Sequence, residues 1–303
     1  MVEVRVPAST ANMGTGFDSF GAALGLYNNI SVKEIEKGLV IKNFGFDEYV
    51  ASGENNLIYR AIMKVFDYVG YERKGLSIYQ KSDIPKTRGL GSSSACIVGG
   101  MVAANHISGK KLSYKKILEL ATEMEGHPDN VAPALFGGFC ISAKTENGVF
   151  VKSIKPENSI RYIAMIPEYY IVTRKSREIL PDKVSLADAS HNIARASAFA
   201  LAINSGDTDN LRELVDDRLH QPYRASYIEG MYDIFDEGYR LGAKAMYLSG
   251  SGPTIIAMVE SGCGDFIKNM TAFFKKAGMN YSFKDLTIDN VGTVLKYKKE
   301  YTF

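Results

Sequence analysis

Apolar residues recur at spacings of three and four positions in the stretch between residues 55 and 70. They would share one side of a helix, and they are Leu57, Ile58, Ala61, Ile62, Val65, Phe66 and Val69. Asn55 and Asn56 precede the stretch and Gly70 follows it, which is typical of N-cap residues and of a C-cap glycine. The pattern predicts an amphipathic helix over residues 57–69.

A second helical pattern follows Ser113, a residue type that favours the N-cap position. Its apolar side consists of Ile117, Leu118, Ala121 and Met124. Gly126 ends the pattern, as a C-cap glycine does. We therefore expect this helix to deliver the chain to the polar segment "HPDN", residues 127–130.

Strand patterns open the first half of the chain. These segments are short, rich in β-branched and aromatic residues, and bounded by turn residues, and they cover residues 2–7, 23–35, 38–44 and 75–82. The second half mixes both patterns. Further strands are expected at residues 161–167, 169–174, 243–250, 253–260 and 293–297, and helices near residues 186–205, 208–219, 226–241 and 265–277.

Strands and helices are grouped along the chain instead of alternating strictly, so the predicted fold class is α+β. The chain has 303 residues, which is long for one core. A polar stretch around residues 144–158 is the best candidate for a boundary. We therefore predict two domains, residues 1–155 and 156–303.

The charge balance narrows the class of partner. Lys and Arg number 36 against 34 Asp and Glu, without long runs of one sign. Such a chain lacks the basic stripe that nucleic-acid binding needs, so we expect a small-molecule partner and no nucleic acid.

Three features predict a cytoplasmic location. Residues 1–10 alternate like a strand and lack the pattern of a signal peptide. No apolar run approaches the ~20 residues that cross a membrane, so no membrane partner is expected. Cys96, Cys140 and Cys263 are odd in number and widely separated, which is typical of reduced thiols.

A glycine- and serine-rich stretch, "KTRGLGSSSACIVGG" at residues 86–100, precedes an apolar run. Gly89 and Gly91 allow positive φ angles and a close approach of backbone N–H groups to an anion. A helix starting near Ser92 or Ser93 would point its unpaired N–H groups and its positive dipole end at the same place. The pattern predicts a phosphate site, although it is not a Walker sequence, and a plain strand-to-helix connection is the alternative.

Two further loops carry polar residues and glycines. "SGSGP", residues 249–253, lies between two strand patterns, where a hairpin turn is the simpler interpretation. The N-terminal loop holds Asn12, Gly14, Gly16 and Asp18, and there an Asx turn is the simpler interpretation.

The three loops, in this order, resemble the motifs of the GHMP small-molecule kinases. The matching segments are "PASTANMGTGFD", "PKTRGLGSSSA" and "SGSGPT", and the resemblance runs from Pro7 to Pro253. Within this superfamily the chain is similar to the homoserine kinase family through "ANMGTGFDSFGAAL", "EGHPDNVAPALFGGF" and "SREILP".

The resemblance implies ATP- and Mg²⁺-dependent transfer of the γ-phosphoryl group to the side-chain hydroxyl of L-homoserine, in threonine biosynthesis. It implies the two-domain GHMP kinase fold, with an N-terminal domain like ribosomal protein S5 domain 2, a ferredoxin-like C-terminal domain and the site between them. Relatives of this kind are commonly dimers, so a homodimer is implied as well.

The resemblance also implies roles for individual residues. The nucleotide loop would comprise Pro85, Lys86, Thr87, Arg88, Gly89, Leu90, Gly91, Ser92, Ser93, Ser94 and Ala95. Ser93 would reach Mg²⁺ together with a glutamate at the end of the helix that leads into "HPDN". Glu119, Glu123 and Glu125 are candidates, and Glu123 or Glu125 is favoured as nearest the helix end. Arg88 is a departure from the family pattern: it reaches the phosphates or, as we favour, points to water.

An amino-acid substrate needs an anion for its ammonium group and cations for its carboxylate. By resemblance Asp18 takes the first role, and Arg177 and Arg224 take the second. Asn12, His127, Asp129 and Asn130 complete the substrate-facing set, and Thr173 supplies a hydroxyl near the transferring phosphate.

The mechanism leaves one question open. We expect alignment and charge stabilisation, in which Asn130 or Thr173 assists, because a loose transition state needs little prior proton removal. Asp129 is the alternative, as a general base. Two other functions stay open: a GHMP kinase for another alcohol, such as mevalonate or a sugar, and a nucleotide-binding sensor without catalysis. Mevalonate has a carboxylate but no ammonium group for Asp18, whereas a neutral sugar has neither.

Overall fold

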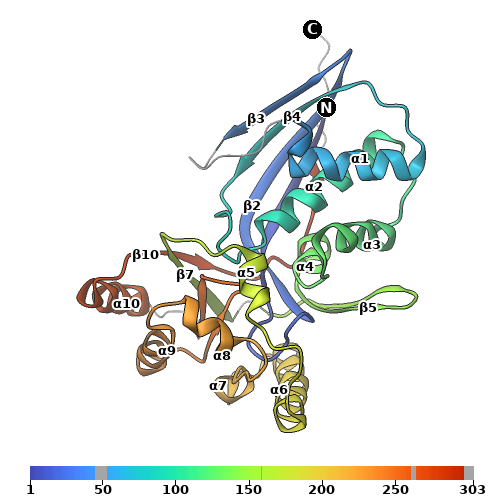
Figure 1. The fold of residues 1–303 in the computed structure, drawn as a ribbon. Helices are drawn as coiled ribbons and strands as arrows, with labels where there is room; N and C mark the ends of the chain where they lie inside the picture. Colours follow the sequence, from blue (N-terminus) through green and yellow to red (C-terminus); the bar gives the residue numbers. More distant parts are fainter. Residues whose placement is uncertain (45–52, 158, 261–263, 297–303) are drawn as a thin grey trace.

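The computed structural model describes residues 1–44, 53–157, 159–260 and 264–296. Its strands form two sheets, and helices pack against both (Figure 1). The α+β class predicted from the sequence is confirmed.

The first sheet has seven strands and lies mostly in the first half of the chain. They are β1 (Val2–Ala11), β2 (Phe20–Ile35), β3 (Leu39–Phe44), β4 (Gly75–Ser82), β5 (Phe139–Thr145), β6 (Gly148–Ile154) and β11 (Val294–Lys296). The order is β11-β1-β2-β4-β3, and β5 pairs with both β2 and β6. Strand β11, from the far end of the chain, therefore pairs with the first strand.

Helices of the first half cover this sheet. They are α1 (Leu57–Val69), α2 (Ser92–Ile107), α3 (Tyr114–Glu125) and α4 (Val131–Phe136), with a 3₁₀ turn at Gly53–Asn55. The predicted caps explain where two of them begin. Asn56 accepts hydrogen bonds from the N–H groups of Ile58 and Tyr59, and Ser113 accepts one from Lys116. Such caps satisfy N–H groups that have no partner inside the helix.

The second sheet is antiparallel, with the order β10-β7-β9-β8. Its strands are β7 (Ile160–Pro167), β8 (Ala245–Leu248), β9 (Ile255–Glu260) and β10 (Tyr281–Leu286). Alternate residues of β7 and β9 belong to two different cores. Tyr162 and Ile256 pack with the core of the first sheet, whereas Ile163 and Ile255 pack with helices of the second half. Because both faces are covered, these strands read as continuous apolar runs.

The second half contributes six helices among the described residues: α5 (Thr173–Glu178), α6 (Leu186–Ser205), α7 (Leu211–Leu214), α8 (Gln221–Arg224), α9 (Met231–Arg240) and α10 (Gly264–Ala277), besides a 3₁₀ turn at Ala225–Tyr227. Helices α9 and α10 enclose the second core through Phe235, Phe266 and Phe274. Helix α6 packs on the first core through Phe199, which contacts the rings of Phe20 and Phe139.

Several predicted elements need correction. The strand expected at residues 169–174 is wrong, because Ile171 turns toward the backbone of Thr87 and α5 begins at Thr173. The helices expected at residues 208–219 and 226–241 are shorter: α7 covers only Leu211–Leu214, and α9 covers Met231–Arg240. Strands β5, β6 and β10 and helices α4, α5 and α8 were not predicted. The division into residues 1–155 and 156–303 stays a prediction.

Two further observations concern the class of protein. In the part of the chain that the structure describes, no helix is both long and apolar enough to cross a membrane. Cys96 and Cys140 are free thiols. Cys263 lies outside the described residues.

Candidate active site

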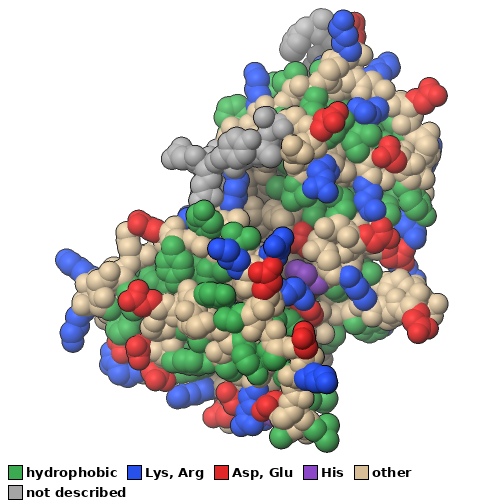
Figure 2. Space-filling model, in the orientation of Figure 1, with side chains coloured by type: hydrophobic (Ala, Val, Ile, Leu, Met, Phe, Trp, Pro, Cys, Tyr) green, Lys and Arg blue, Asp and Glu red, His purple; other side chains and the backbone are tan. Residues whose placement is uncertain are grey.

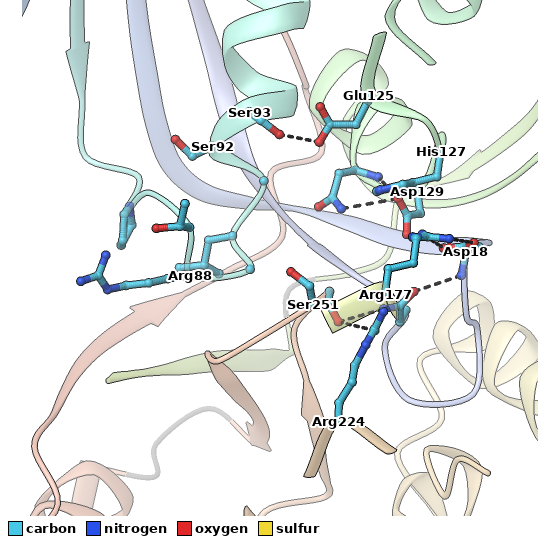
Figure 3. Close-up of a pocket in the computed structure, with 18 residues that line it drawn as sticks. Asp18, Arg88, Ser92, Ser93, Glu125, His127, Asp129, Arg177, Arg224 and Ser251 are labelled. Atoms are coloured by element: carbon cyan, nitrogen blue, oxygen red, sulfur yellow. Dashed lines mark hydrogen bonds and ion pairs between the residues drawn. The ribbon is translucent and has the colours of Figure 1, made fainter. Parts of the chain in front are cut away.

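A pocket opens where loops of both halves meet, and its empty volume, with the solvent at its mouth, is about 680 Å³ (Figure 3). It brings together residues from all three sequence motifs: Asn12, Asp18, Pro85, Thr87, Arg88, Gly89, Leu90, Gly91, Ser92, Ser93, Glu125, His127, Asp129, Asn130, Arg177, Arg224, Gly250 and Ser251. The predicted phosphate loop and the predicted substrate residues thus line one cavity.

One wall of the pocket is the loop that leads into α2. Gly91 is the N-cap of α2, with φ 69°, and no side chain caps the first-turn N–H groups of this helix. Helix α2 has sixteen residues. The start of such a helix offers unpaired N–H donors and a positive dipole end to an anion. The geometry fits the predicted phosphate site.

Two glycines let this loop approach its neighbours. A Cβ atom at Gly89 would lie 2.2 Å from the carbonyl oxygen of Ser249, and one at Gly91 would lie 2.0 Å from Ser9 Oγ. Both distances are too short for a real contact, and both residues have positive φ. Glycine is therefore required at both positions by space as well as by backbone conformation.

The hairpin turn between β8 and β9 holds the loop from the other side. Ser249 Oγ donates a hydrogen bond to the carbonyl oxygen of Gly89 at 2.6 Å, and it lies within hydrogen-bond distance of the Thr10 hydroxyl, at 2.9 Å. The simpler interpretation of this motif, a hairpin turn, is confirmed. The turn nevertheless borders the pocket through Gly250 and Ser251.

An oxygen pair lies at the start of α2. Ser93 Oγ donates a hydrogen bond to the carboxylate of Glu125, the last residue of α3. The other two candidate glutamates point elsewhere: Glu123 pairs with Lys64 at 2.8 Å, and Glu119 pairs with Lys116. Hydroxyl and carboxylate oxygens are the ligands that Mg²⁺ prefers, so Ser93 and Glu125 fit such an ion beside a bound phosphate.

The turn between α3 and α4 supplies three pocket residues. His127 Nδ1 contacts the Asp129 carboxylate, which also accepts a hydrogen bond from the N–H of Asn130 at 2.8 Å. Burial lowers the pKa of His127, but the hydrogen bond and charge of Asp129, with Glu125 and Asp18 nearby, outweigh it and raise the pKa above 6.5. Asn130 accepts a hydrogen bond from Ser9 Oγ at 2.8 Å, which ties this turn to β1.

A second charged pair spans the two halves of the chain. Arg177 donates two hydrogen bonds to Asp18, from Nη1 to Oδ2 at 2.9 Å and from Nη2 to Oδ1 at 2.7 Å. Burial raises the pKa of Asp18, but the hydrogen bonds and charge of Arg177 outweigh it, so the pKa lies below 3.8. Asp18 and Arg177 therefore carry opposite charges at neutral pH.

The loop between β1 and β2 places Asp18 through Asn12. Asn12 Oδ1 accepts a hydrogen bond from the N–H of Asp18 at 3.0 Å, and its Nδ2 donates one to the carbonyl oxygen of Gly250, also at 3.0 Å. Asn12 and Asp18 both have positive φ. This bridge to the β8–β9 turn is more than the Asx turn that the local sequence suggested.

Arg224 enters the pocket from a buried position. It is 3% exposed, and it donates hydrogen bonds to the carbonyl oxygens of Gly250 at 2.9 Å and Ser176 at 3.2 Å. Burial, followed by the like charge of Arg177, lowers the pKa of Arg224 to about 10. The group still carries its charge at neutral pH, close to Arg177.

Two residues behind Arg224 were not predicted. His220 Nδ1 accepts a hydrogen bond from Arg224 Nη1 at 3.2 Å, and its Nε2 lies 2.8 Å from the carbonyl oxygen of Gly14. Asp217 in turn accepts hydrogen bonds from the N–H groups of His220 and Gln221. The histidine four residues before Arg224 was the available signal, because that spacing places both on one side of a helical turn.

Some predicted residues lie outside the pocket. Ser94 and Ala95 are buried inside α2, and Lys86 borders an adjoining cavity. The expectation that Arg88 points to water is wrong: it donates hydrogen bonds to the carbonyl oxygens of Pro167 and Glu168. The side chain of Thr173 lies outside the described residues.

The ligand atoms of Asp18, His127 and Asp129 lie within 4.8 Å of one another. Such a cluster resembles a metal site in composition. However, Asp18 is paired with the Arg177 guanidinium, and Asp129 with His127. These partners already neutralise the carboxylates, so Ser93 and Glu125 fit a cation better.

The pocket therefore has two ends of different chemistry. At one end, backbone N–H groups and the Ser93–Glu125 pair suit a phosphate group with a divalent cation. At the other end, one carboxylate and two guanidinium groups suit a molecule that carries both an ammonium group and a carboxylate. This combination can hold a phosphoryl donor against a small zwitterionic acceptor.

Comparisons with known proteins agree with this geometry. Residues 56–138 match the family described as GHMP kinases N terminal domain, and residues 199–274 match GHMP kinases C terminal. A homoserine kinase from Clostridium beijerinckii is 44% identical over 296 residues, which cover 97% of this chain and 98% of that protein.

Solved structures show the same fold. The homoserine kinase of Cytophaga hutchinsonii superposes with a TM-score of 0.86 at 26% identity, over 97% of each chain. The mevalonate kinase of Methanococcus jannaschii superposes with a TM-score of 0.71 at 16% identity, over 95% of this chain and 98% of that one. With this sequence similarity over nearly the whole length and with the two-ended pocket, the chain belongs to the homoserine kinase family of the GHMP kinases.

Proposed function

We propose that the pocket transfers the γ-phosphoryl group of ATP to the side-chain hydroxyl of L-homoserine and produces O-phospho-L-homoserine. One observation carries this proposal: Asp18, Arg177 and Arg224 face the same cavity as the phosphate loop. A carboxylate and two guanidinium groups complement the ammonium and carboxylate groups of an α-amino acid.

The paired state of Asp18 and Arg177 supports this assignment. Each group alone would be a partly buried charge, and the pair neutralises both. An amino acid can replace the pair without leaving a charge uncompensated, because its ammonium group would bind Asp18 and its carboxylate would bind Arg177 and Arg224. Mevalonate has no ammonium group, and a neutral sugar has neither charge.

The nucleotide would occupy the other end. The triphosphate would bind the backbone N–H groups of residues 85–93 and the start of α2. An adjoining, mostly apolar cavity of about 670 Å³, bordered by Asn56, Leu57 and Cys96, shares Thr87, Ser92 and Ser93 with the pocket, so it fits the nucleoside. We further propose a cytoplasmic location, in keeping with the free thiols Cys96 and Cys140.

Ser93 and Glu125 would hold Mg²⁺ against the phosphates. The ion, when bound, supplies charge neutralisation for the transferring group. The protein would align the acceptor: Asp18, Arg177 and Arg224 would hold the amino-acid end, and Asn130 lines the same pocket. As the homoserine oxygen bonds to the γ-phosphorus, the bond from that phosphorus to the β-phosphate oxygen breaks, the hydroxyl proton passes to an oxygen of the transferred phosphoryl group and from there to water, and ADP leaves.

Positioning and charge stabilisation carry the reaction in this proposal, without a general base. His127 and the Asn130 N–H both contact one oxygen of Asp129, so this carboxylate has a structural role in the turn. We expect Asp129→Asn to retain turnover within about tenfold, whereas loss of a true base would cost ~10²–10⁴-fold. Loss of that size, with ATP and Mg²⁺ affinities intact, would make Asp129 the base.

A coupled assay of ADP release tests the function. The acceptors are homoserine, serine, threonine, mevalonate and galactose, each with ATP and Mg²⁺. We expect ADP release with homoserine and a loss of kcat/KM of at least ~100-fold in Asp18→Asn, because the ammonium group loses its charged partner. ADP release only with mevalonate or galactose would overturn the assignment of homoserine as the substrate. If none of the five acceptors gives ADP release, a sensor without catalysis is favoured.

A further inference from the structure

Gln80 is a buried polar residue on a face of β4 that is otherwise apolar at this depth. Alternate residues of a strand share one face, and the two before Gln80 on this face, Leu76 and Ile78, belong to the core of the first sheet. Gln80 itself is only 5% exposed. Burying an amide costs free energy unless its N–H and C=O groups find partners. The polar groups of Gln80 therefore need a physical reason.

The nitrogen of the Gln80 amide is fully used by protein partners. Its Nε2 donates hydrogen bonds to Asn28 Oδ1 at 3.1 Å and to Cys96 Sγ at 3.3 Å. Asn28 Nδ2 donates to the same sulfur at 3.4 Å. If the Gln80 amide were reversed, its oxygen would face the Asn28 oxygen, and two acceptors would oppose each other. The three side chains thus fix the orientation of the amide.

The oxygen of the same amide has no such partner. Among the residues that the structure describes, none donates a hydrogen bond to Gln80 Oε1, and protein atoms do not seal this oxygen off. Gln80 borders the adjoining cavity that fits the nucleoside, together with Leu57 and Cys96. Figure 2 shows that the surface is hollowed between the two halves, where the pocket and this cavity open. A buried acceptor therefore faces the cavity.

The chemistry of the cavity indicates what would satisfy this acceptor. The walls are mostly apolar, and the cavity continues into the phosphate loop through Ser92 and Ser93. A flat heterocyclic base attached to the phosphates would fill such a space, and it would need a hydrogen-bond donor opposite Gln80 Oε1. Among purines, adenine carries an amino group at C6. Guanine and hypoxanthine carry an oxygen there, and unsubstituted purine carries only a hydrogen atom.

We propose that Gln80 selects the nucleobase of the phosphoryl donor, because its Oε1 accepts a hydrogen bond from the exocyclic amino group of adenine. Asn28 and Cys96 are positioning residues that keep the amide oxygen pointed at the base. This inference rests on the proposed function for the place of the nucleoside. A base with an oxygen at C6 would set two acceptors against each other in a site that excludes most water, so it would bind more weakly.

Nucleotide affinities test the proposal without any phosphoryl acceptor. Calorimetry with Mg²⁺ measures the Kd of ADP, of inosine diphosphate and of purine riboside diphosphate. We expect the natural chain to bind ADP ~10–100-fold more tightly than the other two, because each of them leaves the buried Gln80 oxygen without a donor. This comparison of three ligands needs no variant, so it does not depend on how a substitution affects folding.

A matched pair of substitutions assigns the preference to one side chain. Gln80→Met keeps the length of the side chain and removes the acceptor, and Tyr79→Met introduces the same residue on the opposite face of β4, where Tyr79 is 41% exposed. Gln80→Met should bind the three nucleotides within about threefold of one another. Tyr79→Met should keep the natural preference. Circular dichroism confirms that both variants are folded.

Four results would overturn the proposal: equal affinity of the natural chain for the three nucleotides, tighter binding of inosine diphosphate, an unchanged preference for ADP in Gln80→Met, or the same loss of preference in both variants. Kinetics separate this inference from the proposed function. If ADP is preferred through Gln80 but homoserine is not phosphorylated, only the proposed function fails. If homoserine is phosphorylated with equal kcat/KM for ATP and inosine triphosphate, only the present inference fails.

Discussion

Asp18 and Arg177 are 159 positions apart in the chain, and yet each is the other's main partner in the pocket. The sequence motifs indicated both residues, and the resemblance assigned them to opposite ends of one substrate. Their pairing could not be predicted, because it depends on how the β1–β2 loop meets α5. In the absence of substrate the two charges neutralise each other, and the ammonium and carboxylate groups of a zwitterion can take the place of this pairing.

Gly91 shows how closely the phosphate loop is packed. Alanine there would combine a positive φ with a Cβ atom 2.0 Å from Ser9 Oγ. We expect Gly91→Ala to lower the free energy of unfolding by ~1–2 kcal/mol through backbone strain, and by a further ~1–3 kcal/mol through overpacking. Urea unfolding measures the sum.

Gly70 is the matched control, because it has φ 63° and nothing lies within 4 Å of its Cβ position. In Gly70→Ala the free energy of unfolding should fall only by the ~1–2 kcal/mol that comes from backbone strain. The affinity for a nonhydrolysable ATP analogue should be unchanged. Equal losses in the two variants would show that the loop has room to adjust and that the close approach is unimportant.

His127 carries the clearest pH dependence in the pocket. Because its pKa is raised in the folded protein, the charged imidazole stabilises the fold below about pH 6.5, and this contribution is lost as the pH rises through the raised pKa. NMR titration should place the pKa above 6.5. Asp129→Asn should lower it, since burial alone disfavours the charged ring; an unchanged pKa would contradict the proposed pairing.

At the scale of elements, the sequence predicted correctly those helices whose ends carry clear capping residues. The ends of α1 and α3 follow from Asn56, Ser113 and two C-cap glycines. Helices α6 and α10 lie where the sequence predicted them, near residues 186–205 and 265–277. The strand expected at residues 169–174 failed because β-branched residues there belong to a turn that packs on the phosphate loop. Strand β6 was missed because it lies within residues 144–158, the stretch that was assigned as a domain boundary.

Helix α8 and the segment before it position Arg224. His220 accepts a hydrogen bond from Arg224, stacks on Phe17 with ring centroids 5.3 Å apart, and lies 2.8 Å from the carbonyl oxygen of Gly14. We expect His220→Gln to raise the KM for homoserine by about tenfold, equivalent to the loss of one hydrogen bond to a charged group, with little change in the KM for ATP. Steady-state kinetics with each substrate varied in turn measures both.

His191→Gln is the matched control. His191 also lies 2.9 Å from a backbone carbonyl oxygen, that of Asp216, but it does not line the pocket. Its substitution should leave both KM values unchanged. A similar rise in the KM for homoserine in both variants would point to a general loss of stability.

At the scale of the whole molecule, the two halves share a core. Tyr162, Ala164 and Ile166 of β7 pack with the residues of the first sheet, and β11 pairs with β1. We expect a fragment of residues 1–155 not to unfold cooperatively on its own, because it lacks both partners. Circular dichroism melting of the fragment tests this, and a sharp transition like that of the full chain would contradict it.

The pocket follows from this shared core. Motifs far apart in sequence meet because β1, α2 and the β8–β9 turn converge at the junction of the two sheets. Most residues that line the cavity were identified through the resemblance to the GHMP kinase motifs, since the residues alone favoured ordinary turns at two of the three loops. It could not show which glutamate faces Ser93, because that depends on the rotation of α3.

A crystal structure with homoserine and a nonhydrolysable ATP analogue tests the central claim most directly. We expect the triphosphate at the loop of residues 85–93 and the start of α2, with homoserine between Asp18 and the two arginines and the Asp18–Arg177 pair separated. A triphosphate bound elsewhere, or homoserine bound with that pair intact, would contradict the account.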